Sequence, residues 1–463
     1  MSMDRRPALV HDHRAMAPPV KRDLVSIEDL STAEILELFE HADEFRANLH
    51  AWSDLCRGTI MATLFFEPST RTRLSFESAM LRLGGGVITA ADGESTSRAK
   101  GESLADTVRV VGGSYADILV VRHPEDGAAR VAARYATVPV VNGGDGAHEH
   151  PTQTLCDLYT LWKEKGRLEG LEVVLCGDLR YSRTIHSFCY ALARFGANIV
   201  TMPYPGFELP DYVLQRLRRD YGVQAATASV ADLPGLAGSS NAAAYLTASK
   251  PHQLALFTNL GNVEVSRIDA IYMTRAQRER HDGEETKDYP RLTRSTMGAA
   301  AAKDARVMHP LPRVDEISYE LDDDPRSVYF RQAELGVPMR MALMAYQLGK
   351  IQLRAAPPEL LSVAPGDAGG SAGPRCRNER CITNNEGVRY LERDFRVRKD
   401  TSPIVLACGY CEREVEARFV GDLHDRRCFP HAAGEVAGIP VGRRAYFETE
   451  DQARGAGFSF PNA

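Results

Sequence analysis

Hydrophobic and polar positions follow two rhythms along the first 350 or so residues. Short, fully apolar runs indicate buried β-strands, whereas apolar residues three or four positions apart indicate amphipathic helices. The two kinds of run alternate, which is typical of a parallel sheet covered by helices. The first predicted helix begins at Ser31-Thr32-Ala33-Glu34, a capping-box pattern, and continues to about Leu49. Folded structure is therefore expected from about Asp23.

This alternation predicts two successive α/β units. The first should hold strands over 59–66, 118–121 and 138–141 and helices over 72–83, 104–111, 127–135 and 152–165. The second should begin with a strand at Leu171, followed by a helix over 184–195, a strand over 198–202, a helix over 210–219 and a strand over 268–272. A last helix is expected from Pro338 to about Gly349, because proline is favoured in the first turn of a helix.

The composition changes after this helix. Residues 355–374 are rich in Pro, Gly, Ser and Ala, which predicts a flexible linker. A cysteine-bearing segment of about 50 residues follows, a length at which a metal or another cross-link is usually needed for folding. The expected parts are an N-terminal extension, two α/β domains, a linker, a small cysteine-bearing domain and an unassigned tail, over 1–22, 23–168, 169–350, 351–374, 375–422 and 423–463.

Charge and hydropathy exclude several classes of protein. The 463 residues carry 56 basic and 62 acidic side chains, a formal charge of −6, which provides no basic field for nucleic acid or an anionic membrane. The N-terminus has no apolar core, and no run of about 18 apolar residues occurs. We therefore expect a cytoplasmic protein that acts on small soluble molecules and binds neither nucleic acid nor membrane.

The clearest candidate for chemistry is Ser69-Thr70-Arg71-Thr72-Arg73, which follows an apolar run and opens a predicted helix. Free backbone N–H groups at a helix start, with hydroxyls and a guanidinium, suit a phosphate-like dianion. A simple helix cap beside a surface arginine would give the same short pattern. Companions near later strand ends favour a site, because α/β proteins gather functional groups there. These companions are Arg122, His150, Gln153, Arg183, Arg275, Gln277 and the segment His309-Pro310-Leu311-Pro312.

Two of these motifs resemble a known family. Phe65–Arg73 resembles the carbamoyl-phosphate loop of the aspartate and ornithine carbamoyltransferases, and Gly143–Leu155 resembles the family's carbamoyl-contact motif. The similarity covers about residues 23–350. Met273–Gln277 and His309–Arg313 resemble the aspartate branch, since an ornithine enzyme would carry cysteine where Pro310 stands. The resemblance implies two parallel-sheet α/β domains, with carbamoyl phosphate bound by 23–168 and aspartate by 169–350, and a final helix that packs back on the first domain.

The resemblance also implies a reaction. The carbamoyl group of carbamoyl phosphate would pass to the amine of L-aspartate, giving N-carbamoyl-L-aspartate and phosphate, in de novo pyrimidine biosynthesis. No cofactor is implied for this chemistry, which depends on positioning and on electrostatic stabilisation. The implied contacts are Ser69, Thr70, Arg71 and Thr72 with the phosphate, Thr72, Arg122 and His150 with the carbamoyl oxygen, Gln153 with backbone carbonyls near Leu311 and Pro312 at the carbamoyl nitrogen, and Arg183, Arg275 and Gln277 with aspartate.

A further loop, Ser97-Arg98-Ala99-Lys100-Gly101-Glu102, resembles the segment with which members of this family reach into a neighbouring subunit's site. By this resemblance, Ser97 would bind carbamoyl phosphate, and Lys100 would take part in catalysis and in aspartate binding. A polar turn before the next helix is the alternative interpretation. Completion of each site by a neighbour implies a homotrimer or a multiple of it.

The spacing Cys376-x4-Cys381 followed by Cys408-x2-Cys411 predicts one structural Zn²⁺ per chain, held by four thiolates. A nucleic-acid-binding zinc ribbon is an alternative, but the acidic charge balance disfavours it. Both cysteine motifs resemble the zinc domain of the aspartate carbamoyltransferase regulatory chain, which implies a fusion of a catalytic chain with part of a regulatory one. Cys428 and His431 are expected to be bystanders.

One stretch departs from the family pattern. Residues 231–266 are more numerous than the family has before the Thr274-Arg275-Ala276-Gln277 motif, and we expect a surface excursion there. Two alternative functions stay open: a carbamoyltransferase for another amino substrate, and a catalytically silent subunit. A silent subunit should have lost some of the charged site residues, and Arg71, Lys100, Arg122 and His150 are all present.

Overall fold

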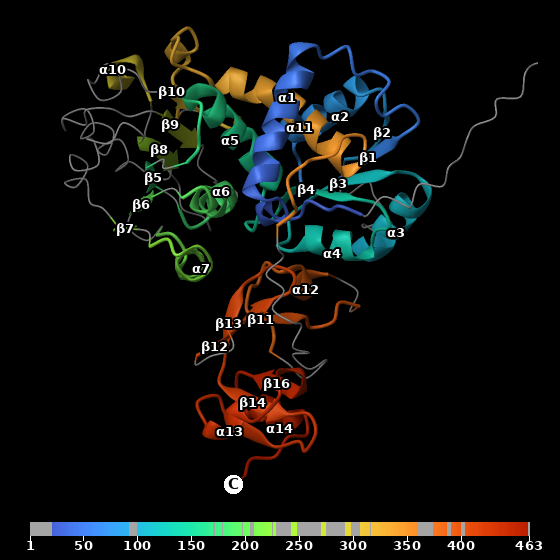
Figure 1. Ribbon diagram of the computed structural model, residues 1–463, viewed down its shortest axis with the longest axis vertical. Helices are drawn as coiled ribbons and strands as arrows, with labels where there is room; N and C mark the ends of the chain where they lie inside the picture. The colour runs from blue at the N-terminus through green and yellow to red at the C-terminus, as the bar shows by residue number, and fades with distance from the viewer. Residues whose placement is uncertain are drawn as a thin grey trace, which may run out of the picture.

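The structure is a computed structural model in which two α/β domains lie side by side and the cysteine-bearing segment and tail extend from one end (Figure 1). None of the helices that it describes is long and apolar enough to cross a membrane. The residues described are 21–91, 100–169, 172–177, 179–196, 198–203, 208–224, 226–227, 242–247, 270–274, 292–297, 306–314, 316–358, 374–386, 390–399 and 403–461.

A four-stranded parallel sheet in the order β2-β1-β3-β4 forms the first domain. Alternate residues of β1 face opposite sides, so that Met61 and Phe65 join one hydrophobic core while Ala62 and Leu64 join another. The elements are η1 (Ile27–Asp29), α1 (Thr32–Ala47), β1 (Ile60–Phe65), α2 (Thr70–Arg82), β2 (Gly86–Ala90), α3 (Leu104–Ser114), β3 (Ile118–His123), α4 (Ala128–Tyr135), β4 (Val140–Asp145) and α5 (Pro151–Lys165). The capping box predicted at Ser31 is confirmed.

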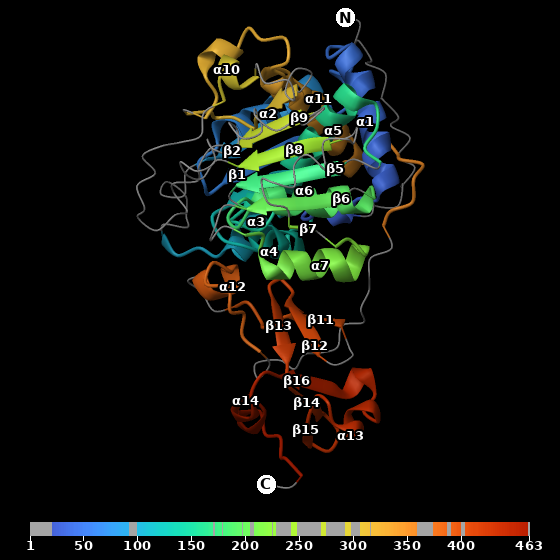
Figure 2. The ribbon, with the colours of Figure 1, turned by 90° about the vertical axis from the view of Figure 1, so that its left-hand side faces the viewer.

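The second domain is built on a six-stranded sheet in the order β10-β9-β8-β5-β6-β7, whose pairs are all parallel (Figure 2). Helix α7 lies below this sheet, on the side of the cysteine-bearing segment. The elements are β5 (Glu172–Gly177), α6 (Arg183–Arg194), β6 (Asn198–Pro203), α7 (Asp211–Tyr221), β7 (Ala226–Thr227), β8 (Ala242–Thr247), β9 (Ala270–Thr274), α10 (Arg294–Met297), β10 (Arg306–Met308) and η6 (Tyr319–Leu321). The predicted fold class, two parallel-sheet α/β domains with a small β domain after them, is confirmed.

Strand β8 corrects the expectation of a surface excursion over 231–266. It lies in the middle of the sheet, paired with β5 on one side and β9 on the other. Its sequence, Ala242-Ala243-Ala244-Tyr245-Leu246-Thr247, was not predicted to form a strand, because alanine is depleted in strands. A buried central strand of a parallel sheet nevertheless has no need of a polar face. The rest of the predicted excursion lies outside the described residues.

The last helix of this part, α11 (Tyr329–Gln347), begins nine residues earlier than predicted and carries Pro338 in its interior. Proline removes one backbone hydrogen bond from a helix, so the prediction placed it at the start. Leu335 and Met339, on either side of Pro338, are buried, and this burial holds the helix together across the proline. As expected from the resemblance, α11 packs back on the first domain, against α1, α2 and α5 (Figure 1).

The C-terminal part forms two small antiparallel sheets, in the orders β11-β12-β13 and β15-β14-β16. The unassigned tail is therefore folded, and because β14 pairs with β15 and β16, the boundary expected at 422 moves to just before Phe419. The elements are α12 (Ile382–Asn385), β11 (Phe395–Lys399), β12 (Ile404–Cys408), β13 (Glu414–Ala417), β14 (Phe419–Asp422), β15 (Cys428–Pro430), α13 (Gly434–Ala437), η8 (Val441–Arg443), β16 (Arg444–Phe447) and α14 (Glu450–Gly455).

The cysteine-bearing domain docks on the start of α4. Backbone hydrogen bonds join Asp126 to Arg380 (2.9 Å) and to Ile382 (3.0 Å), and Asn378 Nδ2 donates to the Asp126 carboxylate (2.8 Å). The next residue, Gly127, has φ +85°, and a Cβ there would lie 2.6 Å from the carbonyl carbon of Tyr410. The two domains thus meet backbone to backbone, where only glycine fits.

We expect Gly127→Ala to loosen this docking and to lower the thermal stability of the chain. A left-handed backbone conformation costs an L-residue about 1–2 kcal/mol, and the close contact adds to that cost. Thermal unfolding and limited proteolysis of the C-terminal part measure the effect. The control is Gly113→Ala on α3, where no atom lies within 4 Å of the new Cβ and the helix should gain about 0.5–1 kcal/mol. A Gly127→Ala protein with wild-type melting and protease resistance would contradict the docking described here.

Candidate active site and metal centre

A cavity of about 660 Å³ opens between the two α/β domains. Most of the residues predicted to bind carbamoyl phosphate line it. Lys100 is exposed and is not among the residues that line the cavity of its own chain, while Ser97, Arg275 and Gln277 lie outside the described residues. The predicted residues that the cavity brings together are Ser69, Thr70, Arg71, Thr72, Arg122, His150, Gln153, Arg183, Leu311 and Pro312.

The loop between β1 and α2 forms one wall. Helix α2 begins at Thr70, and the side chain of its N-cap residue, Ser69, makes no capping hydrogen bond to the helix. The first N–H groups of an α-helix have no partner within the helix, and its dipole places partial positive charge there. Arg71 is exposed at this wall, whereas Thr72 is buried. This geometry suits a phosphate group.

Three cationic or polar side chains meet opposite this loop, around Gly144. A Cβ at Gly144 would lie 3.0 Å from Arg122 Nη1, 3.2 Å from His150 Cδ2 and 3.3 Å from Arg183 Cζ. The residue has φ +113°, so its conformation and the surrounding side chains both call for glycine. Arg122 and His150 come from the first domain and Arg183 from α6 of the second, so the site is shared by the two domains.

Glu67 is a site residue that sequence analysis missed. Its Oε2 atom lies 3.3 Å from Arg122 Nη2 and 3.4 Å from Arg183 Nη1. One carboxylate therefore links two guanidinium groups of different domains and offsets part of their mutual repulsion. The available signal was its place at the end of a predicted strand, directly before the phosphate loop.

His150 is the N-cap residue of α5, where its ring accepts a hydrogen bond from the Gln153 N–H at 3.4 Å. A neutral imidazole whose Nδ1 accepts carries its proton on Nε2. The backbone N–H of His150 donates to Ser187 Oγ of the second domain, at 3.2 Å. The Gln153 side chain is held through its Nε2, which donates to Asp157 at 2.8 Å.

The segment Leu311-Pro312 enters the cavity from the second domain through a cis peptide bond. His309 orients it: Nδ1 accepts from the Leu311 N–H at 2.8 Å, and Nε2 lies 2.9 Å from Glu316 Oε1. Burial lowers the pKa of His309, more strongly than the hydrogen bond with Glu316 raises it. The ring is therefore neutral near pH 7 and serves to fix the loop.

Arg340, on α11, is a second cavity residue that the sequence did not point to. It is 5 % exposed, and its Nη1 donates to Ser75 Oγ at 3.1 Å and to the Gly336 carbonyl at 3.0 Å. Its guanidinium lies over the Phe76 ring at 5.0 Å. The returning helix thus adds positive charge to the cavity and supports the first turns of α2.

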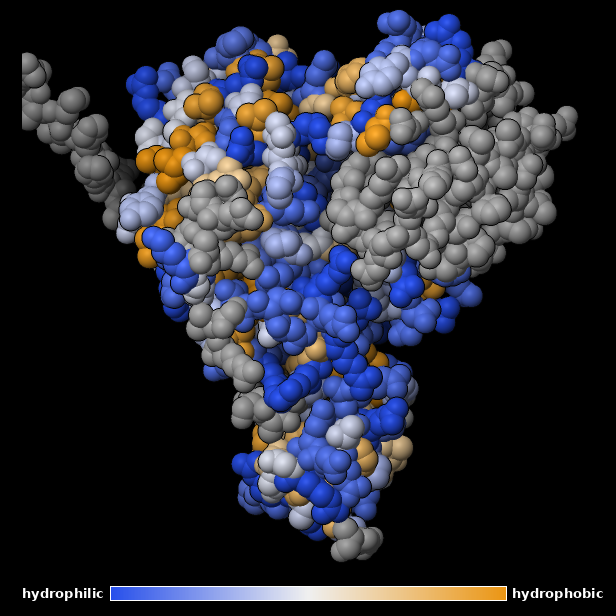
Figure 3. Space-filling model, turned by 180° about the vertical axis from the view of Figure 1, so that it is seen from behind, coloured by the Kyte–Doolittle hydropathy of each residue, from blue (hydrophilic) through white to orange (hydrophobic). Residues whose placement is uncertain are grey.

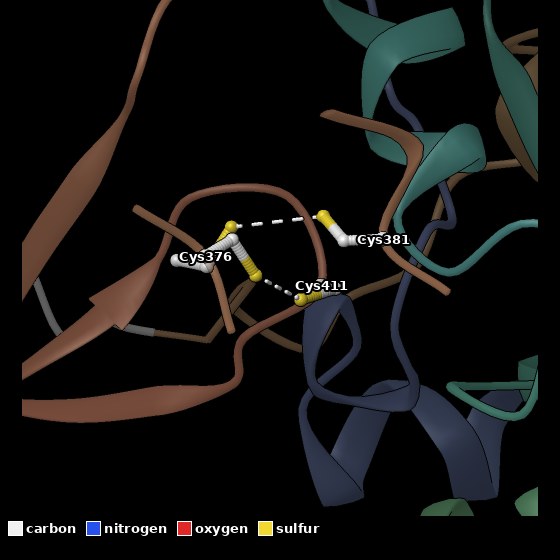
Figure 4. A group of neighbouring side chains, drawn as sticks. Cys376, Cys381 and Cys411 are labelled. Carbon is white, nitrogen blue, oxygen red and sulfur yellow. Dashed lines mark hydrogen bonds between the residues drawn. The ribbon is translucent and has the colours of Figure 1, made fainter. Parts of the chain in front are cut away.

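A second centre lies in the C-terminal part, where the four predicted metal ligands come together. The sulfur atoms of Cys376, Cys381, Cys408 and Cys411 all lie within 4.8 Å of one another. Figure 4 shows the side chains of Cys376, Cys381 and Cys411 pointing toward one another. The separation is 3.4 Å for Cys376 and Cys411 and 4.0 Å for Cys381 and Cys408. A tetrahedral ion with metal–sulfur bonds of about 2.3 Å requires sulfur atoms about 3.8 Å apart, so the cluster fits such an ion. Cys428 lies outside it, in the core of the tail.

Fold and site together define a two-domain α/β protein with a cationic cavity between its domains and a cluster of four cysteines, suited to a metal ion, in its C-terminal part. Three comparisons identify its relatives. The carbamoyl-P binding domain of the aspartate/ornithine carbamoyltransferases matches residues 22–163, and the Asp/Orn binding domain of that family matches residues 238–347. The metal binding domain of the aspartate carbamoyltransferase regulatory chain matches residues 374–420. The chain belongs to the aspartate/ornithine carbamoyltransferase family and joins to it a domain of the regulatory-chain type.

Individual relatives fall in the aspartate branch. The chain is 44% identical to the aspartate carbamoyltransferase catalytic subunit of Clostridium kluyveri over 334 residues, 71% of this chain and 98% of the relative, and 43% identical to that of Methanopyrus kandleri over 339 residues, 72% and 99% of the two chains. Its fold is similar to the catalytic subunit of M. jannaschii aspartate transcarbamoylase, with 40% identity, a TM-score of 0.58 and coverage of 71% and 98%. It is also similar to the Trypanosoma cruzi enzyme in complex with carbamoyl aspartate and phosphate, with 35% identity, a TM-score of 0.57 and coverage of 72% and 98%. The predicted resemblance is confirmed.

Removal of the metal by chelation, or Cys408→Ser, is expected to unfold the segment from 374 to about 418 and to leave the α/β core intact. A four-thiolate site contributes directly to the folding of so small a domain. Metal content, protease sensitivity and thermal unfolding measure this. The control is Cys428→Ser, which changes a thiol outside the cluster and should keep the metal. Unchanged protease resistance after complete loss of metal would contradict a folding role for the site.

Proposed function

We propose that this chain is an aspartate carbamoyltransferase, which converts carbamoyl phosphate and L-aspartate to N-carbamoyl-L-aspartate and phosphate in pyrimidine biosynthesis. The observation that carries the proposal is the convergence of Arg122, His150 and Arg183 around Gly144, opposite the N-terminus of α2, where the geometry suits a phosphate group. The aspartate-branch relatives support the choice of amino substrate.

The proposed chemistry is transfer through a tetrahedral centre with a negatively charged oxygen beside a leaving phosphate. The N–H groups at the start of α2, with Ser69, Thr70 and Arg71, hold the phosphate and stabilise it as it leaves. Thr72, Arg122 and the Nε2–H of His150 face the carbamoyl oxygen, where negative charge develops in the transition state. Gln153 Oε1 and the carbonyls of Leu311 and Pro312 accept from the carbamoyl nitrogen. These groups act by orientation and electrostatics, without a cofactor.

Aspartate carries two carboxylates, for which guanidinium groups are the preferred partners. Arg183, which lines the cavity, binds one of them in this proposal. We assign Arg275 and Gln277 to the same substrate on the strength of the family motif. Arg183 already pairs with Glu67. A carboxylate of bound aspartate would therefore compete with Glu67, rather than with water, for the Arg183 guanidinium.

We assign one structural Zn²⁺ per chain to the four cysteines. Thiolate sets of this kind favour Zn²⁺, and the sulfur separations fit its tetrahedral geometry. Four protein ligands leave no open position, so the ion would support folding rather than the reaction. The protein is assigned to the cytoplasm, where a thiolate centre stays reduced.

We further propose that the chain forms a homotrimer, or a multiple of one, in which Ser97 and Lys100 complete a neighbour's site. Exposed apolar side chains on the first domain support a subunit interface: Leu74 is 52 % exposed, Leu81 60 % and Ile88 40 %. Apolar residues gather on that side of the molecule (Figure 3). Leu74 also lines the cavity, so an interface there would lie beside the site.

The experiment that tests the proposed function compares amino acceptors. Purified protein with carbamoyl phosphate should release phosphate and form carbamoyl-aspartate far faster with aspartate than with ornithine or putrescine. Equal or reversed rates would favour a carbamoyltransferase for another substrate, and no turnover of any acceptor would favour a silent subunit.

Arg71→Ala should lower kcat by at least about 100-fold. Loss of a single charge-stabilising donor of this kind costs about 10²–10³ in kcat, because the contact is strongest where charge develops. The matched control is Arg73→Ala on the same helix: Arg73 lies 3.6 Å from Glu77, is not among the cavity residues, and should leave kcat almost unchanged. A near-normal kcat in Arg71→Ala would place the phosphate elsewhere.

The shared site predicts complementation between inactive chains. Lys100→Ala and Arg71→Ala proteins, dissociated and reassembled together, should recover activity, since some sites would then combine an intact Arg71 with a neighbour's intact Lys100. Each variant reassembled alone serves as the control. Mixed oligomers that are verified by mass and remain inactive would show that every site is built within one chain.

A further inference from the structure

A buried ionic cluster lies where the two α/β domains meet the cysteine-bearing domain, and its centre is Glu412. This residue follows Cys411 in the turn between β12 and β13, with φ +58°, and its side chain is 10 % exposed. The carboxylate contacts the guanidinium groups of Arg130 on α4 and Arg216 on α7 and lies 3.5 Å from Arg398 of its own domain. One acidic side chain therefore binds both substrate domains at the same time.

The contact with the second domain is reinforced around Arg216. Its guanidinium lies over the Tyr190 ring at 4.5 Å and also contacts Glu28, while Arg219, on the same helix, lies 2.7 Å from Glu414. Helix α7 packs on α6, the helix that begins with Arg183 of the cavity. A shift of α7 would therefore move α6 and, with it, Arg183 of the candidate aspartate site.

On the side of the first domain, Glu412 lies close to the segment that ends in His150. Nε2 of His148 lies 4.0 Å from Glu412, and its Nδ1 lies 3.1 Å from Asp145. Glu149, the next residue, accepts from Ser187 Oγ of α6 at 3.2 Å, and the same hydroxyl oxygen receives the His150 N–H. The cluster therefore adjoins the backbone that carries the catalytic histidine.

The groups of this cluster also argue against a second metal centre. His148, Glu149 and Glu412 place potential ligand atoms within 4.8 Å of one another. However, both oxygens of Glu412 are engaged by guanidinium groups, Oε1 by Arg130 and Oε2 by Arg216. The positive charge that neutralises Glu412 is thus already supplied by the protein. A buried carboxylate that gave up these partners to a metal ion would be strongly destabilised.

We propose that Glu412 is a positioning residue for the reaction: by holding α4 and α7 together it sets the orientation in which Arg183 of the second domain faces Arg122 and His150 of the first. The inference rests on the proposed function and adds to it that the metal-binding domain supports aspartate binding within its own chain. The phosphate loop belongs to the first domain alone. Loss of Glu412 should therefore affect aspartate more than carbamoyl phosphate.

The test uses the full-length, metal-loaded protein with Glu412→Gln, which keeps the shape of the side chain and removes its charge. We expect the KM for aspartate to rise about fivefold or more, the lower end of typical coupling between sites, and the KM for carbamoyl phosphate to change much less, with the metal content and the oligomer mass unchanged. The matched control is Glu416→Gln on β13, an exposed residue of the same hairpin that makes no ion pair with any described residue and should behave as wild type.

Arg216→Met keeps much of the packing over Tyr190 and does not alter the β12–β13 hairpin that carries Cys408 and Cys411. It therefore tests the link between Glu412 and α7 if Glu412→Gln fails to fold. It should raise the aspartate KM by itself, and adding Glu412→Gln to it should produce less than the product of the two single effects. Multiplicative effects, an aspartate KM equal to that of the Glu416→Gln control, or a parallel change in both KM values would overturn the inference. Wild-type protein that does not carbamoylate aspartate would instead overturn the proposed function.

Discussion

Convergence of positive charge in a confined space is the constraint on which the rest of this structure depends. Two like charges about 5 Å apart at an effective dielectric constant of 20 repel each other by about 3 kcal/mol. Arg122 and Arg183 meet around Gly144 from different domains, and Glu67 stands between them. The carboxylate makes the gathering of cations tolerable before any substrate is bound. It also means that the site exists only while the two domains keep their relative orientation.

The sheet of the first domain has a separate hydrophobic core on each face, one leading to the cavity and the other to the cysteine cluster. Residues on one face of β1 and β3 belong to the core formed with α1, α5 and α11, and the last two of these helices also carry residues of the cavity. Residues on the other face belong to a core that continues through α3 and α4 into the cysteine-bearing domain, where Cys381, Ile382 and Tyr410 are part of it. The metal domain is therefore an extension of the hydrophobic core of a catalytic domain, joined to it by apolar packing as well as by the ion pairs of Glu412.

Much of this could be predicted from the sequence, where local signals and tertiary structure agree. The apolar run before Ser69, the capping box at Ser31 and the spacing of the four cysteines are local features, and the structure keeps them. The failures occur where packing overrides local preference. Strand β8 is rich in alanine and was missed, and α11 continues through Pro338 because Leu335 and Met339, before and after the proline, are buried. Glu67 and Arg340 were missed because their roles depend on partners far away in the sequence, Arg183 for the one and Ser75 for the other.

Covalent connection gives the docking of the metal domain on α4 a property that separate chains lack. The segment between 358 and 374 joins the two, so docking is a unimolecular equilibrium, with an effective concentration of the order of millimolar for a short linker. The hydrogen bonds at Asp126, the apolar core and the ion pairs of Glu412 would have to hold against dilution if they joined two separate proteins. Here occupancy is independent of protein concentration, and each catalytic domain has one metal domain by construction. An assembly of two kinds of subunit needs balanced expression to reach a fixed ratio of catalytic to metal-binding domains. In this chain, translation of a single polypeptide fixes that ratio at one to one.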